Sequence, residues 1–383
     1  MIGAADVAAR FERAFGHAGE TSWVPGRVNL IGDHVDYCGG AVLPMPIQFG
    51  TTIAVRATTR RRIRCVSANL PNEPVEVRCD APVDLPHGAW GRFVAGAVGE
   101  LTAAGIAISG ADVLVAGDIP GSGLSSSASL AVALLFGLAR GVGFTFGPID
   151  LALAAQRIEH RYVGVQCGLM DQAAVVLATP NSALWFDCFD HRHRSIAVDD
   201  SVEVLVVDTH RARRLVDSQY NARLRETALA AERLGADRTQ LARIDADDFA
   251  MRCESIDDPI ALRRARHVVG EAGRVAQAVD ALAVRDWRRL GGLFDASHAS
   301  LRDDFEASCD ELDVLAELLR AQPGCYGARM TGAGFGGNVV ALFERGRGRS
   351  ALAAIADPYR ARFGRVPTGF AARSLGGART LDG

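Results

Sequence analysis

The sequence predicts an α+β fold with two domains, and three observations lead to that prediction. Strand-like and helix-like segments follow one another without strict β–α–β alternation, which disfavours a doubly wound sheet. The chain has 383 residues, which suits about two domains. Hydrophobic residues make up 49% and charged residues 23%, as in a globular protein with a sizeable core. We place the domain boundary in the charged stretch 190–200, which separates residues 1–195 from residues 196–383.

The N-terminal half is expected to begin with a helix and to continue as a mixture of strands and helices. The apolar residues of segment 4–16 recur at helical spacing, and the segment lacks the apolar core of a signal peptide. Short runs of apolar and β-branched residues indicate strands, because such side chains pack well on a pleated sheet. Strands are predicted at residues 22–28, 41–58, 62–68, 75–79, 111–116 and 183–186, and further helices at 93–104, 128–138 and 150–162.

The C-terminal half is predicted to be mainly helical between two groups of strands. An apolar β run covers residues 202–207. Helical spacing then extends over residues 218–319 and is interrupted near Gly235 and at residues 257–259, because glycine and proline end helices. The last strands are predicted at residues 327–330, 338–343 and 366–373.

The composition excludes several classes of function. All 42 cationic side chains are arginines and none is lysine, so mechanisms that need the lysine of P-loop enzymes, protein kinases or Schiff-base enzymes are excluded. The net charge is −3 and both signs are interspersed, which argues against a nucleic-acid partner. No run of 18 or more apolar residues indicates a membrane span. The eight cysteines form no Cys-x-x-Cys pair, which favours reduced thiols in a cytoplasmic protein.

A loop with several distinct polar side chains follows the first predicted strand. Residues 25–40 contain Arg27, Asp33, His34 and Asp36 between glycines. Carboxylates and imidazole can hydrogen-bond the neighbouring hydroxyl groups of a sugar, and arginine can hold a carboxylate or a transferred phosphoryl group. A solvated polar turn is the alternative, but the density of different polar groups makes a binding loop the better interpretation.

A glycine- and serine-rich loop precedes the strongly apolar helix predicted at residues 128–138. It reads Gly-Asp-Ile-Pro-Gly-Ser-Gly-Leu-Ser-Ser-Ser-Ala over residues 117–128. Glycines and the free N–H groups of a helix N-terminus allow phosphate oxygens to approach, and serine hydroxyl groups can donate to phosphate or bind Mg²⁺. A serine that only caps the helix is the alternative, yet three serines after Gly-x-Gly exceed what a cap requires.

Two acidic residues form the third candidate group. Glu159 lies late in a predicted helix, and Asp171 follows it in apolar surroundings beside Met170. A carboxylate in such surroundings needs a partner or a function. We expect Asp171 to accept a hydroxyl proton, with Arg27 as its ion-pair partner. An aspartate that only caps a helix is the alternative.

A glycine-rich segment near the end of the chain, residues 330–338, matches a pattern of dinucleotide-binding folds. Gly332, Gly334 and Gly337 fit Gly-x-Gly-x-x-Gly. We reject a dinucleotide site, because no β–α–β unit surrounds the pattern and a strand rather than a helix is predicted after it. A glycine-rich turn between two strands, pressed against a ligand or another loop, fits the sequence better.

Together, these segments resemble the GHMP small-molecule kinases and are most similar to the galactokinases among them. Residues 26–37, 121–128 and 331–337 look like three family motifs in their usual order, and the similarity covers nearly the whole chain. Segments 208–221 and 298–306 resemble two further galactokinase segments. The resemblance implies an N-terminal α+β domain and a ferredoxin-like C-terminal domain, with the active site between them.

The resemblance also implies roles for the candidate residues in ATP-dependent phosphorylation of galactose at its anomeric hydroxyl group. Asp171 is expected to be the general base or to orient the C1 hydroxyl, and Arg27 to pair with it and stabilise developing charge. Mg²⁺ is expected on Ser127 and Glu159. The sugar is expected to contact Asp33, His34, Val35, Asp36 and Tyr220. ATP is expected to contact Ser67, Gly121, Ser122, Gly123, Leu124, Ser125, Ser126 and Ser127.

Three positions depart from the galactokinase pattern. Asp33 stands where glutamate is usual, and its side chain, one methylene shorter, reaches about 1.3–1.5 Å less far. Ala333 replaces a usual glycine, and Asn338 replaces a usual small or sulfur-containing residue. Asp33 keeps an alternative open, a kinase for N-acetylgalactosamine, arabinose, a uronic acid or a non-sugar alcohol.

A non-catalytic regulator that senses sugar and ATP is a hypothesis from a different class. Such a relative is expected to lose part of the phosphate loop or the catalytic aspartate. Here residues 125–128 and Asp171 are intact, which disfavours this hypothesis. Relatives in the family are often monomers, so we expect a monomer whose partners are small-molecule substrates.

Overall fold

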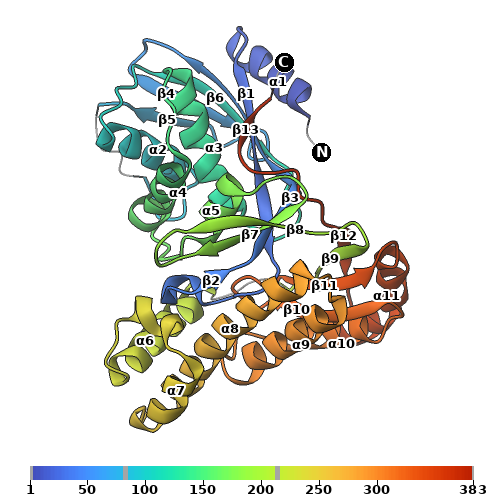
Figure 1. Ribbon diagram of the computed structural model, residues 1–383. Coiled ribbons are helices and arrows are strands. Elements are labelled where there is room, and N and C mark those ends of the chain that lie inside the picture. Colours follow the sequence, from blue (N-terminus) through green and yellow to red (C-terminus); the bar gives the residue numbers. More distant parts are fainter. Residues whose placement is uncertain (1–2, 81–84, 212–215, 382–383) are drawn as a thin grey trace.

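The chain forms two lobes, with the N-terminal residues in most of one and the C-terminal residues in most of the other (Figure 1). The computed structural model describes residues 3–80, 85–211 and 216–381. Three sheets organise these residues, with strand orders β13-β1-β3-β6-β4-β5, β10-β11-β9-β12 and β2-β7-β8. The mixture of largely antiparallel sheets with helices confirms the predicted α+β class.

The six-stranded sheet forms the centre of the N-terminal lobe. Its neighbouring strands are antiparallel, except that β4 and β6 run parallel. β13 comes from the C-terminal end of the chain and places Thr380 opposite Ser22 of β1, so the chain returns to its first strand. The strands are β1 (Glu20–Asn29), β3 (Pro44–Ala57), β4 (Arg62–Ser67), β5 (Val75–Arg78), β6 (Ala111–Gly117) and β13 (Arg379–Thr380).

Helices cover both faces of this sheet, because its central strands are apolar on both sides. In β3, Ile53 and Val55 belong to one core and Ala54 to another, as the alternation of a strand requires. Helix α3 is apolar nearly all round and is largely buried among its neighbours. The helices of this lobe are α1 (Ala4–Phe15), α2 (Gly91–Ala103), α3 (Ser126–Gly141), α4 (Pro148–Arg157) and α5 (Met170–Leu177).

The four-stranded antiparallel sheet and six helices form the C-terminal lobe. Asp258 caps α8 by accepting from the N–H groups of Ile260 and Ala261, and Gly235 follows the end of α6, so both predicted interruptions are confirmed. The strands are β9 (Val202–Asp208), β10 (Cys325–Thr331), β11 (Asn338–Glu344) and β12 (Thr368–Ala371). The helices are α6 (Val216–Arg233), α7 (Ala246–Arg252), α8 (Pro259–Ala283), α9 (Trp287–Asp303), α10 (Asp310–Arg320) and α11 (Gly348–Phe363).

The third sheet joins β2 (Ala41–Val42), β7 (Ser182–Asp187) and β8 (His193–Ala197). β8 is not predicted from the sequence, because its side chains are mostly exposed and polar. The pattern also fails to predict α5 and α11. The proposed boundary near residue 195 stays a prediction. Within the described part of the chain, no helix has both the length and the hydropathy needed to cross a bilayer.

Candidate active site

The sequence motifs meet at one cavity of about 500 Å³ between the lobes. The end of β1, the loop before α3, and α5 supply walls from the N-terminal lobe. α6 and the glycine-rich turn between β10 and β11 supply walls from the C-terminal lobe. Among the expected site residues, the lining includes Arg27, Asp33, His34, Asp36, Gly123, Ser125, Ser126, Ser127, Glu159, Asp171 and Tyr220.

Arg27 and Asp171 form an ion pair, as the sequence predicts. Nε and Nη2 of Arg27 both contact Oδ1 of Asp171, at 2.9 and 2.7 Å. The arginine side chain is 5% exposed, whereas the aspartate side chain is 25% exposed and borders the cavity. Because the guanidinium group uses one carboxylate oxygen, Oδ2 is not engaged by Arg27 and can accept a proton from a bound hydroxyl group.

The same arginine holds the phosphate loop, residues 121–127. Its Nη1 donates to the carbonyl oxygen of Gly123 at 2.8 Å, and its backbone N–H donates to that of Leu124 at 3.1 Å. This approach needs Gly26, at an irregularity of β1, because a Cβ atom there would lie 2.6 Å from the Leu124 oxygen. One side chain therefore connects the phosphate loop with Asp171.

The last two residues of the phosphate loop begin helix α3, so the free N-terminal N–H groups of the helix lie at the cavity. Ser125 precedes the helix with a left-handed backbone, φ 61°, and its buried Oγ has no hydrogen-bond partner among the described residues. A buried hydroxyl group without a partner is costly unless a ligand supplies one. Ser126 and Ser127 follow in the first turn and line the cavity. This arrangement suits an anionic ligand.

Glu159 reaches the cavity from a π-helical turn, Ile158–Val163, that continues α4. Such turns widen a helix by one residue and are frequent at functional sites. The carboxylate accepts hydrogen bonds from the side chains of Ser127, Gln172 and Cys167, the last at 3.3 Å. These donors fix the orientation of the carboxylate beside the phosphate loop.

Ser127 and Glu159 supply oxygen atoms of the kind that Mg²⁺ prefers. Burial raises the pKa of Glu159, and the negative charge of Asp171 adds to this effect. A divalent cation beside Glu159 would offset both. The described residues contain no group of three or more His, Cys, Asp or Glu that could hold a metal ion. The residues present therefore fit an ion held partly by one carboxylate and partly by nucleotide phosphates.

Asp36 places a second carboxylate in the cavity, at the start of the 3₁₀ turn Asp36–Cys38. A Cβ atom at position 168 would overlap its Oδ2, so Gly168 lets the chain pass close to it. Burial, and then the charge of Asp171, raise the pKa of Asp36 to about 7. Asp36 and Asp171 thus line the same cavity, and the charge of Asp171 disfavours ionisation of Asp36.

Asp33 is held by the protein on three sides. Nη2 of Arg329 donates to Oδ2 at 2.7 Å. Nδ2 of Asn29 and the N–H of Gly332 donate to Oδ1 at 2.9 and 3.1 Å. The side chain borders the cavity but is only 1% exposed. Most of its hydrogen-bonding capacity is used inside the protein, which leaves less for a sugar than the sequence suggests.

His34 forms part of the cavity wall with both ring nitrogens engaged by the protein. Nδ1 lies 2.9 Å from the Tyr37 hydroxyl and Nε2 lies 3.2 Å from the Ala333 carbonyl oxygen. Burial lowers the pKa of His34 to about 3. The neutral ring therefore donates from Nε2 and accepts at Nδ1. His34 therefore shapes the cavity wall and has no free N–H group to donate to a ligand.

Comparisons with known proteins agree with this geometry. The galactokinase galactose-binding signature matches residues 9–57, and the N-terminal and C-terminal domains of GHMP kinases match residues 92–179 and 278–361. A galactokinase of Roseiflexus sp. (strain RS-1) is 38% identical over 100% of this chain and 98% of its own length. One of Chloroflexus aurantiacus is 38% identical over 93% of this chain and 92% of its own length.

The chain belongs to the galactokinase family. The crystal structure of Lactococcus lactis galactokinase complexed with galactose matches with a TM-score of 0.95 and 33% identity, over 98% of this chain and 99% of that one. A mevalonate kinase of Methanococcus jannaschii shares the fold, with a TM-score of 0.64 and 15% identity over 95% of this chain and 99% of its own. The predicted two-domain GHMP fold and the family resemblance are confirmed, and membership in a kinase family implies ATP as the cosubstrate.

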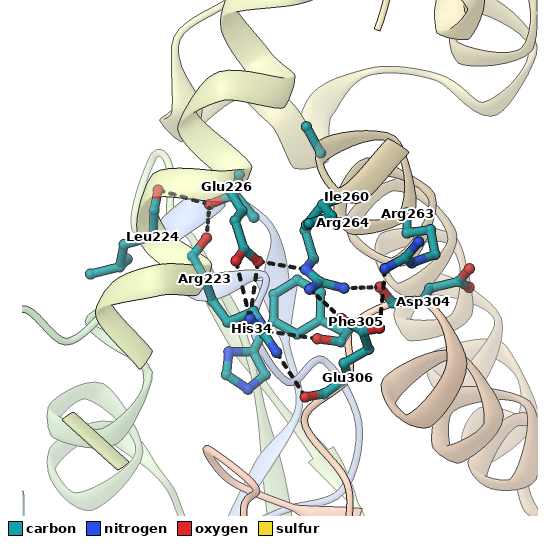
Figure 2. A network of polar contacts seen from close by, with 12 residues as sticks. His34, Arg223, Leu224, Glu226, Ile260, Arg263, Arg264, Asp304, Phe305 and Glu306 are labelled. Atoms are coloured by element: carbon teal, nitrogen blue, oxygen red, sulfur yellow. Dashed lines mark hydrogen bonds and ion pairs between the residues drawn. The ribbon is translucent and has the colours of Figure 1, made fainter. Parts of the chain in front are cut away.

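A loop of this galactokinase-family chain lies beside the cavity residue His34 and is held by a network of polar contacts (Figure 2). This support loop, residues 304–306, lies between α9 and α10, and the ring of its Phe305 packs 4.6 Å from that of His34. Arg223 of α6 donates from Nε to the carbonyl oxygen of Phe305 at 2.7 Å and from Nη2 to that of residue 306 at 2.8 Å. Arg264 of α8 donates from Nη1 to that of residue 304 at 2.5 Å.

Carboxylates complete the network around the support loop. Glu226 accepts from Arg223 at 3.0 Å and from Arg264 at 2.6 Å. Both guanidinium groups also lie over the aromatic ring of the loop, 5.9 and 5.8 Å from its centroid. Arg223 follows Tyr220 by three residues on one face of α6, and the ring of this cavity tyrosine packs 5.8 Å from that of His34.

Several residues expected at the site do not line the cavity. Val35 and Leu124 are buried in two different apolar cores. Ser67, at the end of β4, uses its Oγ to accept from the backbone N–H groups two and three residues later. Gly121 and Ser122 lie on the exposed outer part of the phosphate loop. Apolar side chains at positions 35 and 124 anchor the loops whose neighbouring residues reach the cavity.

Other residues of the site are not predicted from the sequence. Arg329 is one of them, although an arginine within an apolar β run is a signal of a buried ion pair. Gln172 is another, although its position directly after Asp171 is a signal that it belongs to the same site. Arg223 gives no such signal, because its partners lie about 80 residues away in the sequence.

Proposed function

We propose that this chain transfers the γ-phosphoryl group of ATP to the anomeric hydroxyl group of galactose, giving galactose 1-phosphate and ADP. The carrying observation is that Arg27 binds both Asp171 and the phosphate loop. A proton acceptor and a phosphate site are thereby held at a fixed separation, as direct transfer requires. The relatives named galactokinase and the solved relative complexed with galactose support the choice of sugar.

The proposed reaction is an in-line displacement. The sugar oxygen forms a bond to the γ-phosphorus atom, while the bond from that phosphorus to the β–γ bridging oxygen breaks and leaves ADP. The hydroxyl proton moves to Oδ2 of Asp171, or is oriented by it before leaving. Arg27 keeps that carboxylate in place and offsets charge that develops beside it. Positioning and electrostatics supply most of the acceleration.

The nucleotide is proposed to lie along the phosphate loop and the start of α3. Gly121, Ser122, Gly123, Leu124 and Ser125 would surround its phosphates with backbone N–H groups, and Ser126 and Ser127 would add donors from the first helical turn. Ser127 and Glu159 would hold Mg²⁺, which when bound neutralises charge on the transferred phosphoryl group. Ser67 is retained as a more distant nucleotide contact. This assignment needs no lysine, and the chain has none.

The sugar is proposed to occupy the part of the cavity bordered by Asp36, Tyr220 and Asp171. Asp33 and His34 would shape this region mainly through the protein bonds they already make. A kinase for a related sugar is the second candidate function. The specific observation that favours it is the short Asp33, whose Oδ2 accepts a hydrogen bond from Arg329 at 2.7 Å.

The experiment that tests both candidates is an ADP-release assay over a panel of sugars. Galactose, N-acetylgalactosamine, glucose, arabinose and galacturonate would be compared at equal concentrations with ATP and Mg²⁺. The highest kcat/KM with galactose is expected. A higher value for another sugar would replace galactose in the proposal, and no ADP release with any of them would favour a non-catalytic sensor.

A cytoplasmic location is proposed with this function. All eight cysteines are free thiols in the structure. Cysteines stay reduced in the cytoplasm, where glutathione and thioredoxin maintain a reducing environment. Fractionation of the host cell followed by the ADP-release assay tests the location.

A further inference from the structure

We infer that Asn338 is a positioning residue for ATP binding, because it anchors the phosphate loop to the C-terminal sheet. This inference rests on the proposed kinase function and deepens it. Asn338 is the first residue of β11 and is 1% exposed. Its Nδ2 donates to the carbonyl oxygen of Ser122 at 2.6 Å. The residue is one of the positions at which the sequence departs from the galactokinase pattern.

The bond completes a series of three anchored carbonyl groups in the phosphate loop. Asn338 holds the carbonyl of Ser122, while Arg27 holds those of Gly123 and Leu124. In a trans peptide the C=O and the following N–H point in opposite directions. The anchored carbonyls therefore turn the N–H groups of residues 123, 124 and 125 away from their anchors, and residues 123 and 125 line the cavity. The N–H groups of Gly123 and Ser125 thereby become available to phosphate oxygens in the cavity.

The two anchors come from different lobes. Arg27 belongs to β1 of the N-terminal lobe, and Asn338 belongs to β11 of the C-terminal sheet. Asp208 of β9 lies opposite Asn338 in that sheet, and its carboxylate lies against Gly121. The outer half of the phosphate loop thus meets the C-terminal sheet at two successive residues. Because Gly121 and Ser122 are exposed and lack apolar packing, a single strong hydrogen bond there governs the position of the loop.

The test compares two variants that remove the donor in different ways. Asn338→Ala removes the amide and leaves space, whereas Asn338→Leu removes it and keeps the branched shape of the side chain. The KM for ATP is expected to rise about three- to tenfold in both, as the loss of one hydrogen bond to a backbone carbonyl predicts. The Kd for ADP, measured by calorimetry, should rise by the same factor. The KM for galactose should stay within about twofold of that of the unaltered chain.

Val339→Ala is the matched control, because Val339 follows Asn338 on β11 and packs in an apolar core that includes no residue of the phosphate loop. It should lower Tm and leave the KM for ATP unchanged. Unchanged KM for ATP and unchanged Kd for ADP in both Asn338 variants would overturn the inference. Equal increases in the KM for ATP and for galactose would overturn it as well. If no sugar supports ADP release even in the unaltered chain, the kinase proposal fails, and the Kd for ADP still decides the role of Asn338.

Discussion

The phosphate loop and the support loop are anchored in the same way but from different positions. In each, three successive backbone carbonyls accept hydrogen bonds from N–H groups outside the loop. In the phosphate loop, Arg27 supplies two of the donors and lines the cavity itself. In the support loop, Arg223 and Arg264 supply all three, and neither is among the residues that line the cavity (Figure 2).

The difference lies in what else the anchors bind. Arg27 also binds the proposed proton acceptor Asp171, so phosphate position and sugar chemistry share one side chain. Arg223 and Arg264 instead share Glu226, and this closed ion network contributes to stability and to the shape of the sugar wall. Substitutions at the phosphate loop should therefore change catalysis and nucleotide binding. Substitutions at the support loop should change stability and sugar binding.

The largest effect on turnover is expected at Asp171, which the phosphate-loop anchor Arg27 also binds. Asp171→Asn keeps the size of the side chain but removes the proton acceptor, so kcat should fall by about 10²–10⁴-fold. Galactose should still bind, because the cavity keeps its shape. Steady-state ADP release and equilibrium binding of galactose give the two quantities. Near-normal turnover in this variant would show that Asp171 is not the proton acceptor.

A second, smaller effect is expected when the shared anchor is changed. Arg27→Lys keeps the charge but cannot bind Asp171 and the Gly123 carbonyl at once, because an ammonium group lacks the guanidinium fork. We expect kcat to fall by about 10- to 100-fold and the KM for ATP to rise, from the loss of charge-assisted hydrogen bonds at two sites. If Arg27→Lys lowered kcat and left the KM for ATP unchanged, Arg27 would not connect the phosphate loop with Asp171.

The predictable part of this molecule is local. The β3 strand, the apolar α3 and the glycine-rich turn after β10 follow from short stretches of sequence, and the structure confirms each. The four motifs also indicate a common site. The support network is not local, because Arg223 meets partners about 80 residues later, and a charged residue on a helix is usually solvated.

The π-helical turn at Glu159 could not be predicted either. Helical spacing predicts one helix over residues 150–162, but the α-helix ends at Arg157 and one turn widens after it. The bonds that hold Glu159 come from Gln172 and Cys167, on the segment that follows. A sequence pattern reports the period of a helix and not the tertiary bonds that distort one turn.

A third prediction tests the support side. Arg223→Lys should leave at least one carbonyl of the support loop without a donor, which costs about 1–3 kcal/mol of unfolding free energy. Tm should therefore fall. The KM for galactose should rise about tenfold, because the support loop no longer holds His34 and Tyr220 in position. The KM for ATP should not change. Thermal unfolding and the two KM values decide the outcome.

The matched control for that variant is Arg263→Lys. Arg263 neighbours Arg264 in α8, but its side chain is 34% exposed and its ion pair with Glu306 at 3.1 Å is correspondingly weak. It should change Tm and both KM values little. If Arg223→Lys behaved like Arg263→Lys, the support loop would not determine sugar binding, and the contrast between the two loops would fail.

The smallest expected effect is a pH dependence of galactose binding through Asp36, which ADP binding does not share. Burial and the charge of Asp171 raise the pKa of Asp36 to about 7. Above this pH, Asp36 is ionised and accepts hydrogen bonds from sugar hydroxyl groups. Below it, the carboxyl group is protonated and loses acceptor capacity. The Kd for galactose should therefore rise about threefold between pH 7.5 and pH 6.5, from the change in the ionised fraction.

The two histidines whose rings pack against Phe305 do not titrate in this interval. Burial lowers the pKa of His34 to about 3 and that of His267 to about 4, so both rings stay neutral. Asp36→Asn should therefore bind galactose more weakly at every pH and lose the dependence between pH 7.5 and pH 6.5. The terminal phosphate of ADP titrates near this range, so the Kd for ADP is compared between the two chains in the same buffers. Its pH dependence should be the same with and without Asp36→Asn, because the anchors of the phosphate loop are an arginine and an amide. A pH dependence of the Kd for ADP that Asp36→Asn abolishes would instead mean that both sides of the cavity respond to the proton on Asp36.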